Sequence, residues 1–215
     1  MLLLFGLSVM LFVSRSIETT PEPKIADRSF ITGEPCKAPC WYGLELDRSN
    51  QSDVITKLRG LPFVDAEAIR TSHVAISSFS NAVEIEYDCA DPKGKICGIL
   101  VLSGGSLKII SSYIRYKLPI RSVIDQLGIP DAITYSPYSP HGDGCMLDLF
   151  WLKKGIRIRR TDRNRIRLCR DLSAGKTIDP ELEMTELFYL SKEALNPDRC
   201  KTGGVCFEWP GLSDK

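Results

Sequence analysis

Eight cysteines are the residues of this chain whose type and spacing could do chemistry. Thiolates can ligate zinc, attack a substrate or pair as disulfides. No Cys-x-x-Cys pair occurs and the only histidines are His73 and His141, which disfavours zinc. An even number of cysteines behind an apolar N-terminus instead predicts disulfides formed in an oxidising compartment. The candidates are Cys36, Cys40, Cys89, Cys97, Cys145, Cys169, Cys200 and Cys206.

Spacing alone leaves many pairings open, and we favour pairs of neighbours. Cys89 and Cys97 flank a turn, Cys200 and Cys206 flank a Gly-Gly loop, Cys36 can pair with Cys40, and Cys145 and Cys169 fall on separate expected strands. The alternative for Cys145 is a nucleophile beside His141. A glycine-rich turn that carries a disulfide cysteine is the favoured interpretation, because the other cysteines need a partner for it.

A basic segment from Lys153 to Arg170 contains the single acid Asp162. We expect a hairpin whose arginines share one face while isoleucines face the core. Such a face could bind an anionic partner: an acidic protein, a phosphorylated polymer or an anionic lipid headgroup. The alternative is a solvated face neutralised by acids on a neighbouring strand. The candidate binding residues are Arg157, Arg159, Arg163, Arg165 and Arg167.

Enzyme signatures are absent from the sequence. It has no Gly-x-Ser-x-Gly, P-loop, Gly-x-Gly-x-x-Gly or His-Glu-x-x-His motif, so we expect no catalytic residues, cofactor or metal. The net charge of +1 gives no general attraction to nucleic acid. The alternative is a secreted hydrolase with an unrecognised site, which Glu84 and Glu86 meeting Asp148 in a pocket would favour.

The N-terminus predicts export. Residues 2–13 are almost wholly apolar, and their helical length of about 18 Å falls short of a bilayer core of roughly 30 Å. We therefore expect a signal peptide or membrane anchor over residues 1–16, then a flexible, proline-bearing linker over 17–35. Two folded units, over 36–116 and 117–215, are expected to follow outside the cytoplasm.

A repeated pattern predicts how those units are built. Val54-Ile55-x-x-Leu58 and Val123-Ile124-x-x-Leu127 form apolar helix faces, each followed by a glycine and a proline that end the helix. Ser49 or Asn50 can cap the first helix, and Gly60 is expected to close it in the left-handed conformation. Strands are expected at 73–77, 82–87, 97–102, 106–113, 132–135, 146–152, 155–159, 165–169 and 184–189. This is an α+β pattern of a short helix and an antiparallel meander, used twice.

The repeat resembles the tandem helix-plus-sheet fold of β-lactamase inhibitory proteins and of SmpA/OmlA-type outer-membrane lipoproteins. The opening Pro39-Cys40-Trp41-Tyr42-Gly43 resembles that of uncharacterised exported bacterial proteins with Pro-Cys-Trp-x-Gly. The chain lacks the cysteine to which lipoproteins of this type attach their lipid, so a lipid anchor is not carried over from the resemblance. It implies a non-enzymatic module that binds another envelope or extracellular protein through its sheet, and it leaves the oligomeric state open.

Overall fold

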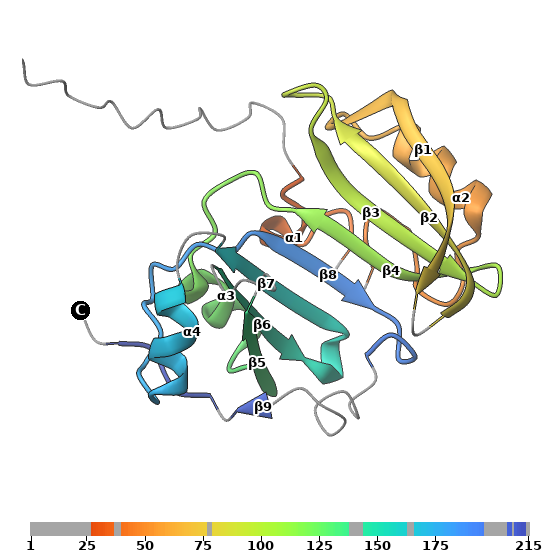
Figure 1. Ribbon diagram of the computed structural model, residues 1–215. Coiled ribbons are helices and arrows are strands. Elements are labelled where there is room, and N and C mark those ends of the chain that lie inside the picture. Colours follow the sequence, from red (N-terminus) through yellow and green to blue (C-terminus); the bar gives the residue numbers. More distant parts are fainter. Residues whose placement is uncertain are drawn as a thin grey trace, which may run out of the picture.

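A computed structural model describes residues 27–36, 40–76, 79–137, 144–162, 166–195, 206–207 and 209–213 (Figure 1). The chain forms an α+β protein in which helices pack on an antiparallel sheet, as the sequence predicts. The helices are α1 (Ser29–Thr32), α2 (Gln51–Arg59), α3 (Ile120–Leu127) and α4 (Ile166–Ser173), with a 3-10 turn, η1 (Leu152–Lys154).

Nine strands form one sheet in the order β1-β2-β3-β4-β8-β7-β6-β5-β9. Every neighbouring pair is antiparallel, and β1 to β4 and β5 to β8 each run as a meander. Strand β8 joins the two meanders because it pairs with both β4 and β7. The strands are β1 (Val64–Ile76), β2 (Phe79–Cys89), β3 (Ile96–Ser103), β4 (Ser106–Tyr113), β5 (Ala132–Pro137), β6 (Cys145–Trp151), β7 (Ile156–Asp162), β8 (Glu186–Leu190) and β9 (Cys206–Phe207).

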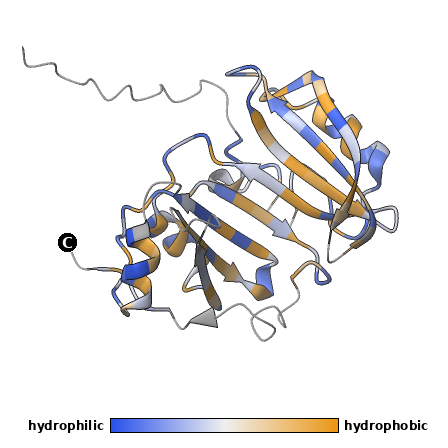
Figure 2. Ribbon diagram, in the orientation of Figure 1, coloured by the Kyte–Doolittle hydropathy of each residue, from blue (hydrophilic) through white to orange (hydrophobic). Residues whose placement is uncertain are grey.

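The helices lie on one face of this sheet. Alternation along the strands sends one set of side chains to the helices and the other set to the opposite face (Figure 2). The main core joins helix residues to strand residues such as Ile85, Ile110 and Ile158. The contributing helix residues are Phe30, Val54, Leu58, Ile120, Val123 and Leu172. All four helices therefore share one core.

Both predicted helices are present, and α2 begins as the sequence indicates. The side chain of Asn50 accepts hydrogen bonds from the backbone of Ser52 and Asp53, and Asp53 bonds back to the backbone of Asn50. This reciprocal cap satisfies donors that the first helical turn leaves unpaired. The predicted left-handed Gly60 is wrong, because its φ is −91°.

One predicted strand is also wrong. Residues 165–169 were expected to pair with β7, but α4 occupies Ile166–Ser173 instead. Leu168 and Leu172 are four residues apart and both pack against the main core. This spacing places them on one helix face, whereas in a strand they would share a face with Arg170 between them.

Three predicted disulfides are confirmed: Cys36–Cys40, Cys89–Cys97 and Cys145–Cys169. The last of these ties α4 to β6. Cys200, and with it the predicted Cys200–Cys206 pair, lies outside the described residues, as does the N-terminal leader. Across the described ranges, no helix is long and apolar enough to cross a membrane.

Candidate binding face

The face of the sheet opposite the main core is the candidate site. We call it the open face, because in the described part of the chain no helix packs on it (Figure 1). The strand registers align its side chains into rows that cross the sheet, and two of these rows form the candidate site. The Ser111 row holds, from β1 to β6, Arg70, Glu86, Ile99, Ser111, Phe188, Arg157 and Phe150. The Tyr113 row holds, from β4 to β5, Tyr113, Glu186, Arg159, Asp148 and Thr134.

A compact ionic cluster occupies the β6–β8 part of this face. Arg159 donates two hydrogen bonds to Asp148, at 2.7 and 3.0 Å. Arg157 approaches the same carboxylate at 3.8 Å, and Glu186 lies 3.8 Å from a second nitrogen of Arg159. The hydroxyl of Ser111 donates to Glu186 at 2.8 Å. These bonds hold long side chains in fixed positions, so the face is organised before any partner arrives.

Phe188 provides an aromatic base for the two arginines. Its ring centroid lies 3.6 Å from the guanidinium carbon of Arg157 and 5.1 Å from that of Arg159. Both distances fall within the range of cation–π attraction. The ring itself is buried, while the arginine side chains above it retain about a fifth of their exposure. The cluster thus presents arginine surface to solvent, with the Phe188 ring beneath it.

Burial and neighbouring charges shift the protonation of this cluster. Burial raises the pKa of Glu186, and the Ser111 hydrogen bond and Arg159 oppose that change. Burial acts to lower the pKa of Arg159, but the hydrogen bond to Asp148 and the carboxylate charges raise it overall. Burial and the charge of Glu186 raise the pKa of Tyr113. At neutral pH Tyr113 is therefore a neutral hydroxyl beside a guanidinium.

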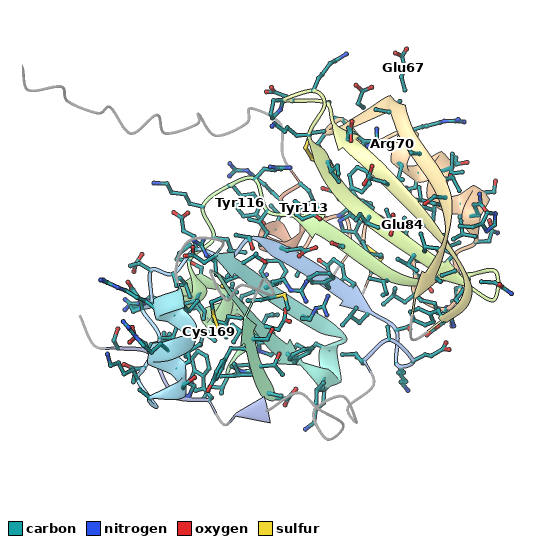
Figure 3. All side chains as sticks on the ribbon, viewed as in Figure 1. Glu67, Arg70, Glu84, Tyr113, Tyr116 and Cys169 are labelled. Carbon is teal, nitrogen blue, oxygen red and sulfur yellow. A yellow bond between two sulfur atoms is a disulfide. The ribbon has the colours of Figure 1, made fainter. Side chains whose placement is uncertain are left out.

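The opposite end of the face carries a second ion cluster. Arg70 bonds Glu86 through two nitrogens, at 2.6 and 2.8 Å, and Asp88 through two more contacts, at 2.5 and 3.2 Å. The hydrogen bonds to Asp88 and Glu86 raise the pKa of Arg70. Glu84, opposite Ser72 in the register, adds a third carboxylate to this face of β2. Figure 3 shows Arg70 and Glu84 here, with Tyr113 nearer the middle of the sheet.

The structure separates the predicted arginine cluster. Arg157 and Arg159 point to the open face while Ile156 and Ile158 are buried, as the alternation predicts. Arg167 lies exposed on α4 instead of beside them, and Arg163 and Arg165 lie outside the described residues. Glu186 on β8 is one of the acids that the alternative interpretation placed on a neighbouring strand, whereas sequence reasoning missed Asp148, Phe188 and Ser111 as neighbours of these arginines. The alternation of side chains along β6 and β8 indicates which face of the sheet these residues lie on. Which residues they contact depends on strand register.

The hydrolase alternative required Glu84 and Glu86 to meet Asp148. The glutamates lie on β2 and the aspartate on β6, with four strands between them. Five strand spacings amount to about 24 Å, so these carboxylates do not converge on one substrate. A groove of about 600 Å³ does lie elsewhere, between α2 and the loop before it. Among the charged residues that line it, Arg48 pairs with Glu45 and Asp53 caps the helix.

A different polar constellation holds the start of the described chain against the domain. The carboxylate of Asp27 accepts hydrogen bonds from Trp41, Tyr42 and Ser112, and from the backbone and hydroxyl of Ser29. Burial together with the charge of Asp27 raises the pKa of nearby tyrosines, namely Tyr42, Tyr87, Tyr116 and Tyr189. These groups are largely enclosed, so the constellation fastens the chain and offers no substrate site. Asp27 itself lies within residues 17–35, the segment that the sequence analysis assigns to the linker.

Within the ranges that the structure describes, no group of histidine, cysteine or carboxylate side chains could hold a metal ion. Comparisons with protein-family models, curated proteins and solved structures gave no match. The geometry of the open face is therefore the basis for inferring function.

Proposed function

We propose that this chain is an exported, disulfide-stabilised protein that binds another protein through its open face and catalyses no reaction. The observation that carries the proposal is the Arg157–Phe188–Arg159 cluster beside Tyr113 and Phe150. Arginine and large aromatic residues dominate the binding energy of protein interfaces. A catalytic site would instead need convergent reactive groups in a cleft.

The ion pairs support a protein partner over a simple anionic surface. Asp148 and Glu186 already match the charges of Arg157 and Arg159, so little free positive charge remains to attract phosphate. Side chains fixed in this way lose little conformational entropy on binding. The face is accordingly suited to shape and aromatic contacts, with charges providing specificity.

The disulfides and the apolar N-terminus support an extracytoplasmic location, at the cell envelope or secreted. We further propose that the domain consists of two related units, one with α2 and β1–β4 and the other with α3 and β5–β8. Their support is a helix followed by four antiparallel strands in each unit, with α4 inserted between β7 and β8 in the second, and the repeated Val-Ile-x-x-Leu pattern. In this arrangement the helices are scaffold and the strands carry the binding surface.

A pull-down from the native envelope tests the binding function. Tyr113→Ser and Phe150→Ser, made together, remove aromatic surface from the open face. The matched control is Arg121→Ser with Asp125→Ser, two exposed positions on α3 at the other side of the sheet. We expect the open-face variant to lose the captured protein and the control to retain it. Equal capture by both variants, with both still folded by circular dichroism, would contradict the proposal.

A further inference from the structure

We infer that the open face binds the open face of a second copy of this chain, about a twofold axis that runs parallel to β4. This inference rests on the proposed function, because it uses the same face. When two sheets stack about such an axis, the strand order of one is reversed over the other. Each row of side chains then faces the same row of the second copy, read in the opposite direction.

The Ser111 row is complementary to itself under this operation. Strand β4 lies at the centre, so Ser111 faces Ser111, β3 faces β8, β2 faces β7 and β1 faces β6. Glu86 then meets Arg157, a contact of opposite charges. Arg70 meets Phe150, which can receive its guanidinium on the ring. Each of these two contacts occurs twice in the dimer.

The Tyr113 row adds one contact between the copies. Tyr113 lies on β4 and therefore faces its own counterpart, where two aromatic rings can stack. Arg159 on β7 faces β2, but Asp88 there is buried and already bonded to Arg70, so this position adds no ion pair. The matching of Glu86 with Arg157 occurs on both sides of the axis and favours a symmetric pair over random association.

The size of the surface predicts a weak dimer. A turn over residues 191–195 packs on Val101 through Ala194, so contact is limited to the two rows. Seven strands at ~4.8 Å and two rows at ~6.8 Å, with their side chains, give a total buried area of about 1,000 Å². That value lies at the low end for specific interfaces, so association in the micromolar range is expected.

Sedimentation of the purified chain tests the dimer directly. At concentrations from about 1 to 300 µM, we expect the mass to rise from 24.0 kDa toward twice that value. Because the contacts include two pairs of opposite charge, Glu86 with Arg157 on each side of the axis, added salt should lower the dimer fraction. A chain that stays monomeric over the whole range would overturn the inference.

Charge reversal tests the predicted contact. Glu86→Arg alone places two arginines opposite each other, and Arg157→Glu alone places two glutamates opposite each other. Each variant should remain monomeric, whereas an equimolar mixture should restore a mixed dimer by native mass spectrometry, since each copy then supplies the charge that the other needs. A mixture that stays monomeric, or single variants that dimerise as well as the parent, would overturn the inference.

Two further measurements keep the test decisive. Circular dichroism establishes whether each variant is folded. If a charge-reversal variant fails to fold, the neutral variants Glu86→Gln and Arg157→Gln replace it. We expect each neutral variant to dimerise more weakly than the parent chain. The pull-down from the native envelope distinguishes the dimer from the proposed binding of a different protein.

A monomeric chain that still captures a different protein through the open face overturns the dimer alone. A chain that neither dimerises nor loses a partner on open-face substitution overturns both.

Discussion

The indole nitrogen of Trp41 donates a hydrogen bond to the carboxylate of Asp27 across 2.9 Å. Trp41 is fully buried, so its N–H group has no access to water. The same carboxylate accepts from Ser112 on β4, which joins the start of the described chain to the sheet. One acidic side chain thus satisfies donors from three separate segments, and buried donors left unpaired are costly.

Replacing Asp27 by Ala should destabilise the domain by about 3 kcal/mol, because the Trp41 and Ser112 donors lose a charged acceptor in a buried site. Asp27→Asn should cost less, since one acceptor oxygen remains. Urea unfolding measures both changes. Glu45→Ala, which removes an exposed ion pair with Arg48, is the control and should change the stability by less than about 0.5 kcal/mol. Equal effects at Asp27 and Glu45 would contradict this role.

Gly98→Ala should destabilise the domain by about 2 kcal/mol or more, because a Cβ there would overlap the Tyr87 ring and the Ser111 carbonyl. Both neighbours lie in the middle of the sheet and cannot move freely. Gly60→Ala is the matched control. Its φ is −91° and its Cβ would meet only ordinary contacts, so the variant should be neutral or slightly stabilising. Thermal unfolding compares the two, and a neutral Gly98→Ala would refute the predicted overlap.

Removal of single disulfides should follow loop length. The Cys145–Cys169 bond closes a separation of 24 residues and the Cys89–Cys97 bond a separation of 8. The chain-entropy model gives losses of about 3.4 and about 2.5 kcal/mol for the corresponding double alanine variants. Losing the first bond should also free α4 from β6. Denaturant unfolding gives the order of the two losses, and a reversed order would show that local packing outweighs loop entropy.

Glu186 should make stability depend on pH. Its pKa is raised in the folded protein, so the native state binds more protons than the unfolded state just above the usual value of 4.5. The stabilisation that Glu186 contributes is therefore present at low pH, and it is lost as the pH rises through the pKa of Glu186 in the folded protein. Glu186→Gln should flatten the fall of unfolding free energy as the pH rises above about 4.5. An unchanged slope, relative to the exposed control Glu45→Gln, would count against the shift.

Local patterns in the sequence were sufficient for most of the fold. Alternation located β2 to β8, but β1 begins at Val64, nine residues before the predicted start, and β9 was not predicted. Val123 with Ile120 marked the buried stripe of α3. The alternation of arginine with Ile166 and Leu168 misled, because over so few residues it fits a strand and a helix equally well. Leu172, one turn beyond Leu168, was the signal for α4.

The binding face could not be predicted in the same way. Arg157 and Arg159 were identified from composition, but their partners Asp148 and Phe188 come from two other strands. Strand order and register decide such contacts, and neither is encoded in local spacing. Asp27 was missed for the same reason, because its partners are contributed by distant segments and its own surroundings are proline-rich and polar.

Site-specific photo-crosslinking tests the central claim most directly. A photoactivatable residue at Tyr113 samples the open face, and the same residue at Ser122 on α3 samples the helix side of the sheet. On irradiation in the native envelope, we expect a crosslinked protein from position 113 and none from position 122. Crosslinks from position 122 alone, or equal crosslinks from both positions, would contradict the open face as the binding surface.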